Sequence, residues 1–335
     1  MKTKVALALL LTVICLAANA RITYELSVKG AVAKVILRVV DQDGVAVPEA
    51  KIWGAFSANR LNDSVLVDGL TNTNGEFIAQ GSCNEVLRVD VMKEGYYHTE
   101  EKINFWQSKS DPIVVDGKWQ PYGETRTVVL KKIKNPIRLR DPGARYRYVY
   151  PESGKWTGFD LVRGDWVPPL GDGKCADIMI RYTREQRPDG FFKSLDVSFT
   201  NNPYAGAYVM NRDSDSEMDS VYEANTNGEY VGNFRYEFER TAKGNHVISE
   251  LGYGQYLVFR IRTKTDEKGE LISAHYGRIM GALQYLEKAG IVLGPVFFNP
   301  TPNDINLEDA ETARLSRLGY KQYLEFDRRR MAKGK

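Results

Sequence analysis

The sequence predicts an all-β protein built from two β-sandwiches, the second larger and of jelly-roll type, followed by a short C-terminal helix. Short runs of β-branched and aliphatic residues recur at close spacing, with Asp-Gly and Asn-Gly turns between them. Helical periodicity is confined to two stretches near the C-terminus, residues 280–288 and 309–330. A length of 335 residues suits two domains of roughly 100 to 200 residues each.

Residues 1–20 have the pattern of a secretory signal peptide. Lys2 and Lys4 precede an unbroken apolar run over residues 5–18, and small residues follow where a signal peptidase requires them, so we expect cleavage before Arg21. The run is shorter than the ~20 residues that a membrane-spanning helix needs, and no transmembrane segment is predicted. The expected location is therefore the periplasm, the cell surface or the extracellular space.

The charge balance excludes two classes of protein. The chain has 46 Lys and Arg residues against 43 Asp and Glu, a formal net charge of +3. This balance, with 43% hydrophobic residues, does not fit a disordered polyelectrolyte. It also argues against a dedicated nucleic-acid binder, because such proteins carry a clear excess of basic residues. We therefore expect no nucleic-acid partner.

The first domain, residues 21–134, is predicted to be a Greek-key sandwich of about seven strands. Its turns are marked by Asp43-Gly44 and Asn74-Gly75, where a positive φ is required. No helical period occurs among its expected strands, which are residues 35–40, 50–56, 65–70, 76–79, 85–92 and 125–132.

Three segments of this domain carry a resemblance to a known family. They are Asp43-Gly44 with Val47-Pro48, the run Thr73-Asn74-Gly75-Glu76-Phe77, and residues 89–97, which end in Gly95-Tyr96-Tyr97. Together they resemble the carboxypeptidase-regulatory-like domain, a transthyretin-like, Ig-like sandwich, over residues 30–133. The resemblance implies a non-catalytic accessory or spacer module of exported proteins and no active site.

Residues 135–155 are predicted to be a linker, because Pro136, Pro142 and Gly143 interrupt a mostly basic stretch. The alternation of charge and aromatic rings from Arg145 to Tyr148 allows a patch for an anionic polymer or lipid surface. The alternative is a solvated connector, because charge runs of this kind usually face the solvent.

The second domain, residues 156–308, is also rich in expected strands, and residues 309–335 form the helical tail. Residues 192–200 alternate between apolar and polar side chains, and residues 255–265 can pair with residues 269–279 across a turn. Residues 158–167, 276–279 and 298–308 resemble segments of uncharacterised exported bacterial β-sandwich proteins, in which such a domain follows a regulatory-like sandwich. That resemblance implies an architecture and no function.

The sequence lacks the common catalytic motifs. His98, His246 and His275 lie far apart and form no metal-binding helix motif, and no nucleophile elbow or phosphate-binding loop is present. Cys83 and Cys175 remain after signal cleavage. They are either two buried thiols or, in an oxidising compartment, a disulfide pair.

Two sets of residues are candidate sites. Asp213, Asp215, Glu217 and Asp219 alternate along one short segment and supply oxygen ligands of the kind that Ca²⁺ prefers; the alternative is an ordinary acidic surface loop. No other cofactor is expected. The candidate ligand-binding residues are aromatic, since a sugar ring can stack on an exposed indole, whereas the alternative for each is core packing. They are Trp106, Trp119, Trp156 and Trp166.

These observations predict an exported, non-catalytic binding or structural protein of the cell envelope, with a carbohydrate or an envelope protein as its partner. The alternative is a polysaccharide-active hydrolase with paired carboxylates in the second domain. A concave cleft with two carboxylates within about 5 to 10 Å of each other and a flanking Trp or Tyr favours the enzyme. A flat face with exposed aromatic side chains favours binding.

Overall fold

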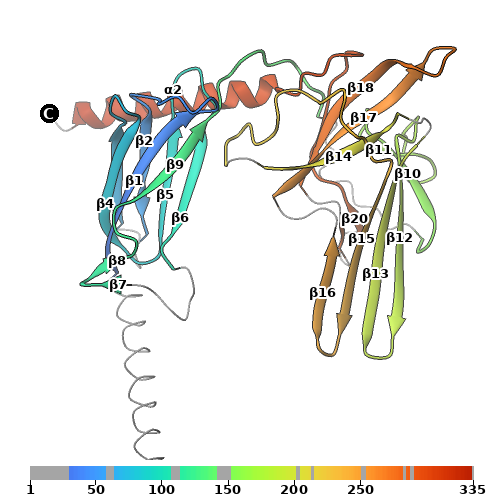
Figure 1. Cartoon of the computed structure of the whole chain (residues 1–335), viewed down its shortest axis with the longest axis horizontal. Helices are drawn as coiled ribbons and strands as arrows, with labels where there is room; N and C mark the ends of the chain where they lie inside the picture. Colours follow the sequence, from blue (N-terminus) through green and yellow to red (C-terminus); the bar gives the residue numbers. More distant parts are fainter. Residues whose placement is uncertain are drawn as a thin grey trace, which may run out of the picture. The chain divides into compact units, whose positions relative to one another are not determined.

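In the computed structural model, the chain forms two compact units (Figure 1). The first unit comprises Met1–Ile133, Ser214–Glu217 and Leu315–Lys335, and the second Lys134–Asp213 and Met218–Arg314. The structure describes residues 30–57, 64–106, 114–141, 152–200, 204–212, 215–249, 254–281, 284–286 and 290–333. The expected signal peptide and residues 142–151 of the expected linker lie outside these ranges. Within them the fold is all-β with a single C-terminal helix, as predicted.

Two sheets form the first unit. One has the strand order β4–β1–β8–β7, and β9 pairs in parallel with β1; the other has the order β3–β2–β5–β6. The strands of the first sheet are β1 (Ala31–Asp41), β4 (Glu76–Cys83), β7 (Val114–Val115), β8 (Lys118–Trp119) and β9 (Glu124–Leu130). Those of the second are β2 (Lys51–Phe56), β3 (Val65–Leu70), β5 (Val86–Met92) and β6 (Thr99–Asn104).

The core of this unit follows from the two-residue alternation of its strands. In β1, Ala33, Val35, Leu37 and Val39 are buried and pack on one core with Ile52 of β2 and residues of the remaining strands. The intervening residues of β1 are more exposed. Alternation of this kind is typical of a sandwich in which each sheet has one face on the core.

The second unit contains a six-stranded sheet in the order β11–β10–β12–β13–β15–β16 and a four-stranded sheet in the order β14–β17–β18–β21. The six strands are β10 (Trp156–Asp160), β11 (Asp165–Trp166), β12 (Ile178–Arg187), β13 (Gly190–Phe199), β15 (Asn233–Thr241) and β16 (Gly244–Ser249). The four are β14 (Gly206–Asn211), β17 (Gln255–Thr265), β18 (Leu271–Met280) and β21 (Val296–Phe298). The strands β19 (Gln284–Leu286) and β20 (Gly290–Val292) form a separate two-stranded sheet.

The four-stranded sheet of this unit is buried on both faces. Leu257, Phe259 and Ile261 of β17 pack on the core shared with the six-stranded sheet. Tyr256 and Val258 point the other way, into a second cluster that loop residues such as Ala224 and Leu307 complete. The near-continuous apolar run in β17 is what such two-sided burial requires.

The helix near the C-terminus, α2 (Ala310–Lys333), begins after Asp309, whose side chain accepts hydrogen bonds from the Thr312 N–H and hydroxyl. The other helix-like stretch, residues 280–288, is not helical where it is described: Gln284–Leu286 is a strand paired with β20, so that prediction was wrong. Among the described residues, no helix combines the length and apolar character that a membrane crossing requires.

Candidate functional site

The outer face of the sheet β3–β2–β5–β6 presents a large aromatic side chain to solvent. In β2, Ile52 and Phe56 are fully buried in the core, so Lys51, Trp53 and Ala55 lie on the opposite face. Trp53 is 36% exposed. A tryptophan on the solvent side of an amphipathic strand contributes little to the core, and its ring is accessible to a ligand.

The strand register places Trp53 in a row of charged residues. Trp53 lies opposite Asp68 of β3 and Asp90 of β5, and Asp90 lies opposite Glu100 of β6. Side chains at such directly opposed positions have Cβ atoms about 5 Å apart. Arg88, two residues before Asp90, forms an ion pair with Glu100 at 3.2 Å between Nη1 and Oε1. An indole ring, a guanidinium and three carboxylates therefore share one face.

All of these side chains except Asp68 border a groove of about 440 Å³. Its floor depends on Gly54, because a Cβ atom there would lie 2.0 Å from the Arg88 carbonyl oxygen and 2.7 Å from the Val89 Cα. Only glycine allows β2 and β5 to approach this closely. The side chains around the groove include Trp53, Ala55, Leu66, Arg88, Asp90 and Glu100.

Helix α2 covers the neighbouring part of the same face. The Tyr323 ring lies 6.2 Å from the Trp53 ring and 4.8 Å from the Lys51 Nζ, and its hydroxyl donates to the Asp68 carboxylate at 3.4 Å. A cavity of about 340 Å³ lies under the helix. It is lined by Trp53, Asp90, Met92, His98, Gly319, Gln322 and Tyr323.

His98 joins three segments of the first unit. Its Nε2 lies 2.8 Å from an Asp90 carboxylate oxygen, and its Nδ1 lies 3.5 Å from a Glu217 carboxylate oxygen. The Ser316 hydroxyl of α2 donates to the Glu217 carboxylate and accepts from the His98 backbone N–H. The Glu217 backbone N–H donates to the His98 carbonyl at 2.9 Å.

The two carboxylates raise the pKa of His98 to about 9, Asp90 being the larger cause and Glu217 the second. Burial opposes this shift. At neutral pH the imidazole is therefore a cation that attaches residues 215–217 and α2 to the edge of the sheet.

The three predicted calcium ligands that the structure describes, Asp215, Glu217 and Asp219, each have a different partner. Asp213 lies outside the described residues. The Asp215 carbonyl accepts from the Glu100 N–H, Glu217 contacts His98, and Asp219 forms an ion pair with Arg212 at 3.1 Å. Across the part of the chain that the structure describes, no three His, Cys, Asp or Glu side chains are placed to hold a metal ion.

The predicted ligand-binding tryptophans fall into two groups. Trp119 is 1% exposed and Trp166 is 2% exposed, and both fill a core, so their rings are closed to a ligand. Trp106 is half-buried against Trp119 and donates to the Asn84 carbonyl at 2.6 Å. Trp156 is exposed, with the Arg181 guanidinium 4.7 Å from its ring. For Trp106 and Trp156, ligand binding stays a prediction.

Trp53 was missing from the predicted set, although the sequence carries a signal for it. The alternation of Ile52, Gly54 and Phe56 with Lys51, Trp53 and Ala55 places the tryptophan on the polar side of the strand. The four predicted tryptophans lie in turn-rich stretches, where the local sequence does not show whether a side chain is buried.

Cys83 and Cys175 are free thiols and belong to different compact units. Cys83 is buried in the core of the first unit, and Cys175 is half-buried in the second. Burial raises the pKa of both thiols, which keeps them protonated and unreactive at neutral pH.

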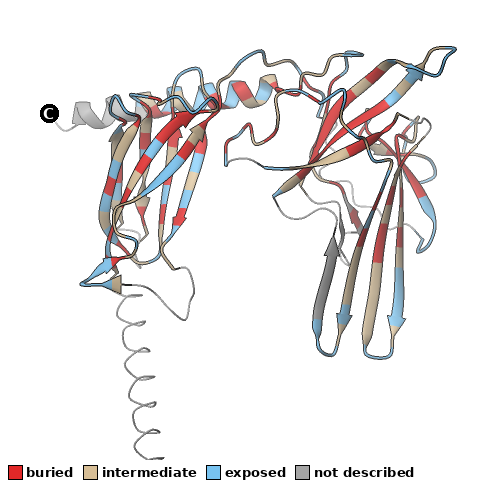
Figure 2. Ribbon diagram, in the orientation of Figure 1, coloured by how far each residue is buried: buried red, intermediate tan, exposed pale blue. Residues whose placement is uncertain are grey.

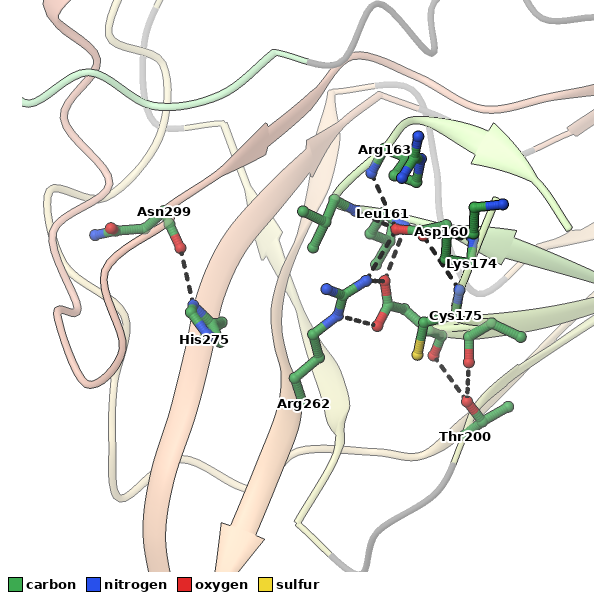
Figure 3. Close-up of polar contacts among 12 residues, drawn as sticks. Asp160, Leu161, Arg163, Lys174, Cys175, Thr200, Arg262, His275 and Asn299 are labelled. Carbon is green, nitrogen blue, oxygen red and sulfur yellow. Dashed lines mark hydrogen bonds and ion pairs between the residues drawn. The ribbon is translucent and has the colours of Figure 1, made fainter. Parts of the chain in front are cut away.

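In the second unit, two carboxylates lie next to each other around one arginine (Figure 3). The Arg262 Nη2 donates to Asp160 at 2.9 Å and to Asp177 at 3.1 Å, while its Nε donates to Asp177 at 2.9 Å. Asp160 also accepts four backbone N–H groups, those of Val162, Arg163, Lys174 and Cys175. Burial opposes ionisation of Asp160, but these donors and the Arg262 charge together lower its pKa.

Arg262 reaches the carboxylates through a local irregularity of β17. The pairing of β17 with β18 shifts register between Ile261 and Lys264, and Arg262 has a φ of 50°. A left-handed conformation is strained for arginine, and a bulge redirects a side chain. The ion pairs with Asp160 and Asp177 offset this strain and connect β17 to the six-stranded sheet.

This carboxylate pair does not fit the hydrolase that the sequence allowed as an alternative. The Asp160 and Asp177 side chains are 1% and 2% exposed, so a polysaccharide cannot reach them. Their oxygens already accept hydrogen bonds from Arg262 and from backbone donors. The arrangement is that of a structural connection within the second unit.

We expect His98→Gln to destabilise the protein by on the order of 2 kcal/mol at about pH 6, with the difference from wild type shrinking towards about pH 10. The pKa of His98 is raised in the folded state, so its contribution is complete below the unfolded-state value of 6.5 and is lost as the pH rises through about 9. Thermal unfolding of both proteins across this range measures the difference.

His275→Gln is the matched control. Burial lowers the pKa of His275, so its contribution changes only at acidic pH and should be constant from about pH 7 to pH 10. If His98→Gln lowered the stability of the protein as much at about pH 10 as at about pH 6, the role of the imidazolium would be contradicted.

We expect Asp160→Ala to lower the free energy of unfolding by about 3 to 5 kcal/mol, because Arg262 and four backbone N–H groups lose a buried acceptor. Urea unfolding followed by circular dichroism measures the loss. Glu185→Ala, which removes an exposed carboxylate from β12, should change stability by no more than about 0.5 kcal/mol. Equal effects of the two substitutions would rule out the structural role of Asp160.

No protein-family model and no curated protein matches the chain. Among solved structures, 3-chlorocatechol 1,2-dioxygenase from Rhodococcus opacus is 14% identical over 32% of this chain and 62% of its own, with a TM-score of 0.25. A streptococcal ancillary pilin is 15% identical over 83% of this chain and 62% of its own, with a TM-score of 0.20. The major pilin subunit BcpA of Bacillus cereus is 14% identical over 80% of this chain and 96% of its own, with a TM-score of 0.20. The chain thus spans 62% of the length of each of the first two structures.

Proposed function

We propose that this chain is an exported, non-catalytic binding protein that holds a carbohydrate on the outer face of the sheet β3–β2–β5–β6. The observation that carries the proposal is Trp53, an exposed indole in one row with Asp90 and Glu100 beside a groove of about 440 Å³. An indole face accepts the apolar face of a sugar ring, and the flanking charged groups can exchange hydrogen bonds with its hydroxyls.

Two expectations from the sequence agree with this role. The pattern of residues 1–20 indicates export, which would place the mature chain at the cell envelope or outside the cell. The resemblance of residues 30–133 to the carboxypeptidase-regulatory-like domain implies a non-catalytic accessory module. A carbohydrate-binding face on an accessory sandwich is consistent with both.

The sequence suggested hydrolase carboxylates in the second domain, but this face of the first unit raises the same question, because Asp90 and Glu100 are directly opposed carboxylates beside a tryptophan. Each already has a cationic partner: His98 for Asp90 at 2.8 Å, and Arg88 for Glu100 at 3.2 Å. A glycosidase needs one carboxyl group that donates a proton. Two carboxylates that are paired with cations are better suited to accept hydrogen bonds from sugar hydroxyls, so we favour binding over hydrolysis.

The test is an array of neutral and acidic polysaccharides probed with the full chain and with Trp53→Ala. We expect capture of at least one polysaccharide by the wild type and a loss of at least about five-fold in Trp53→Ala, because a stacked aromatic contact is worth about 1 kcal/mol or more. Trp156→Ala removes the other exposed tryptophan and should leave this capture intact. Loss of capture in Trp156→Ala alone would move the site to the second unit and overturn the proposal.

Incubation of the captured polysaccharide with the protein, followed by an assay for new reducing ends, separates binding from hydrolysis. We expect no new reducing ends. Release of reducing ends that disappears in Glu100→Gln would establish the hydrolase in place of the binding protein.

A further inference from the structure

Helix α2 covers part of the outer face of the sheet β3–β2–β5–β6 and leaves a cavity beneath it. Val91 of β5 points into the core, so Met92 lies on the outer face, where it lines this cavity and is only 7% exposed. Within helix residues 315–325, Ser316 and Tyr323 are buried, and the residues between them are half-buried or exposed (Figure 2). The helix therefore contacts the sheet closely at two positions about two turns apart.

Polar contacts hold the helix at both of these positions. The Ser316 hydroxyl accepts from the His98 backbone N–H and donates to the Glu217 carboxylate. The Tyr323 hydroxyl donates to the Asp68 carboxylate at 3.4 Å. Because the helix is attached on either side, the walls of the cavity are in place before any ligand arrives, which lowers the cost of binding.

Gly319 leaves the helix side of the cavity without a side chain. Glycine is unfavourable in the interior of a helix relative to alanine or leucine. Beyond its chain neighbours and the backbone of the helix itself, none of the described residues has an atom within 4 Å of a Cβ placed at Gly319. Close packing therefore does not explain the glycine, whereas a larger residue would narrow the cavity. Gly319 and Gln322 are both exposed, so the cavity opens to solvent on this side.

The walls of the cavity are mainly apolar, and two of them are aromatic. The Trp53 and Tyr323 rings lie 6.2 Å apart with 53° between their planes, and Met92 adds a thioether. A planar ring packs well against aromatic side chains and against the sulfur of methionine. An apolar cavity of about 150 Å³ holds benzene, so a cavity of about 340 Å³ has room for two fused rings.

Asp90 and His98 form the polar wall of the cavity. The His98 cation already lies between two carboxylates, at 2.8 Å from Asp90 and 3.5 Å from Glu217. A carboxylate has about four acceptor sites, so Asp90 can accept a hydroxyl group in addition to the hydrogen bond from His98. A charged ligand would lose its hydration next to an ion pair that exists without it, which favours a neutral ligand with one hydroxyl.

We propose that the cavity under α2 binds a neutral aromatic compound of about two fused rings, with its ring against Trp53 and Tyr323 and its hydroxyl on Asp90. This goes beyond the proposed carbohydrate binding, because the ligand is of another class and enters from the helix side of Trp53. The groove of about 440 Å³ is not bordered by any described residue of α2. A sugar fits the cavity less well, since the apolar walls leave most of its hydroxyls without partners.

The experiment is a titration of the full chain, isotope-labelled at its methionine methyl groups, with 2-naphthol at neutral pH, followed by NMR. We expect the Met92 methyl signal, assigned from its loss in Met92→Leu, to shift because the bound ring lies next to it. The Met218 methyl, which belongs to the second unit, should not shift. This readout locates the ligand directly.

Three analogues of 2-naphthol test the class of ligand. Decahydro-2-naphthol keeps the hydroxyl without the aromatic rings, while 2-naphthoate and 2-naphthylmethylammonium keep the rings and carry a charge. Each should bind at least about five-fold more weakly than 2-naphthol, because each loses either ring packing or neutrality.

Gly319→Leu tests the place of binding. It adds a side chain to the cavity and should weaken 2-naphthol binding by at least about ten-fold, while the better helix former raises the melting temperature. The matched control is Lys321→Leu, which adds the same side chain at an exposed position about 200° around the helix. It should bind 2-naphthol within about two-fold of the wild type. The titration does not depend on polysaccharide capture, so this proposal and the carbohydrate site can fail separately.

Four outcomes would overturn the proposal. An unchanged Met92 signal, or equal binding by Gly319→Leu and the wild type, would place any bound 2-naphthol elsewhere. Equal binding of decahydro-2-naphthol would exclude recognition of an aromatic ring. Tighter binding of either charged analogue would assign the cavity to a charged ligand. The Met92 signal decides the question even if Gly319→Leu fails to fold.

Discussion

The two-residue alternation of paired strands is the constraint on which the rest of this structure depends. It places Ile52 and Phe56 in a core and Trp53 on the other face, and in the second unit it continues the core row of Tyr182 and Leu195 into basic residues. Because a slip of one residue would exchange the two faces of a strand, core packing and surface chemistry are fixed by the same register. The proposed binding face at Trp53 is therefore a consequence of how the core is built.

Charged groups have two distinct uses in this protein, and burial separates them. Asp160 and Asp177 are almost fully buried and surrounded by donors, and the Arg262 that joins them has a strained backbone. Asp90 and Glu100 are paired with cations at a groove on a sheet face, where a ligand can reach them. Proximity of two carboxylates alone thus does not identify an active site. What surrounds them, and whether a substrate fits, decides their role.

The sequence predicts the secondary structure, which depends on local patterns. It does not predict which segments far apart in the chain come into contact. The all-β class and the C-terminal helix follow from turn residues, alternation and periodicity, and the structure confirms them. The burial of Trp119 could not be predicted, because its two-residue strand owes its place to a parallel pairing with β1. The contact of His98 with Glu217 joins segments far apart in the chain, so spacing gave no signal of it. The exposure of Trp53, by contrast, could have been predicted from the alternation of buried and exposed residues in its strand.

The first unit is assembled from segments that the ribosome makes at very different times. Its two sheets are complete by Ile133, but Ser214–Glu217 and Leu315–Lys335 belong to the same compact unit. Until those later segments have been synthesised, His98 lacks Glu217 and Ser316, and Lys51 and Trp53 lack the ring of Tyr323. The unit whose sequence begins first can therefore reach its final form only after the whole of the second unit has been made, so folding cannot proceed strictly from the N-terminus.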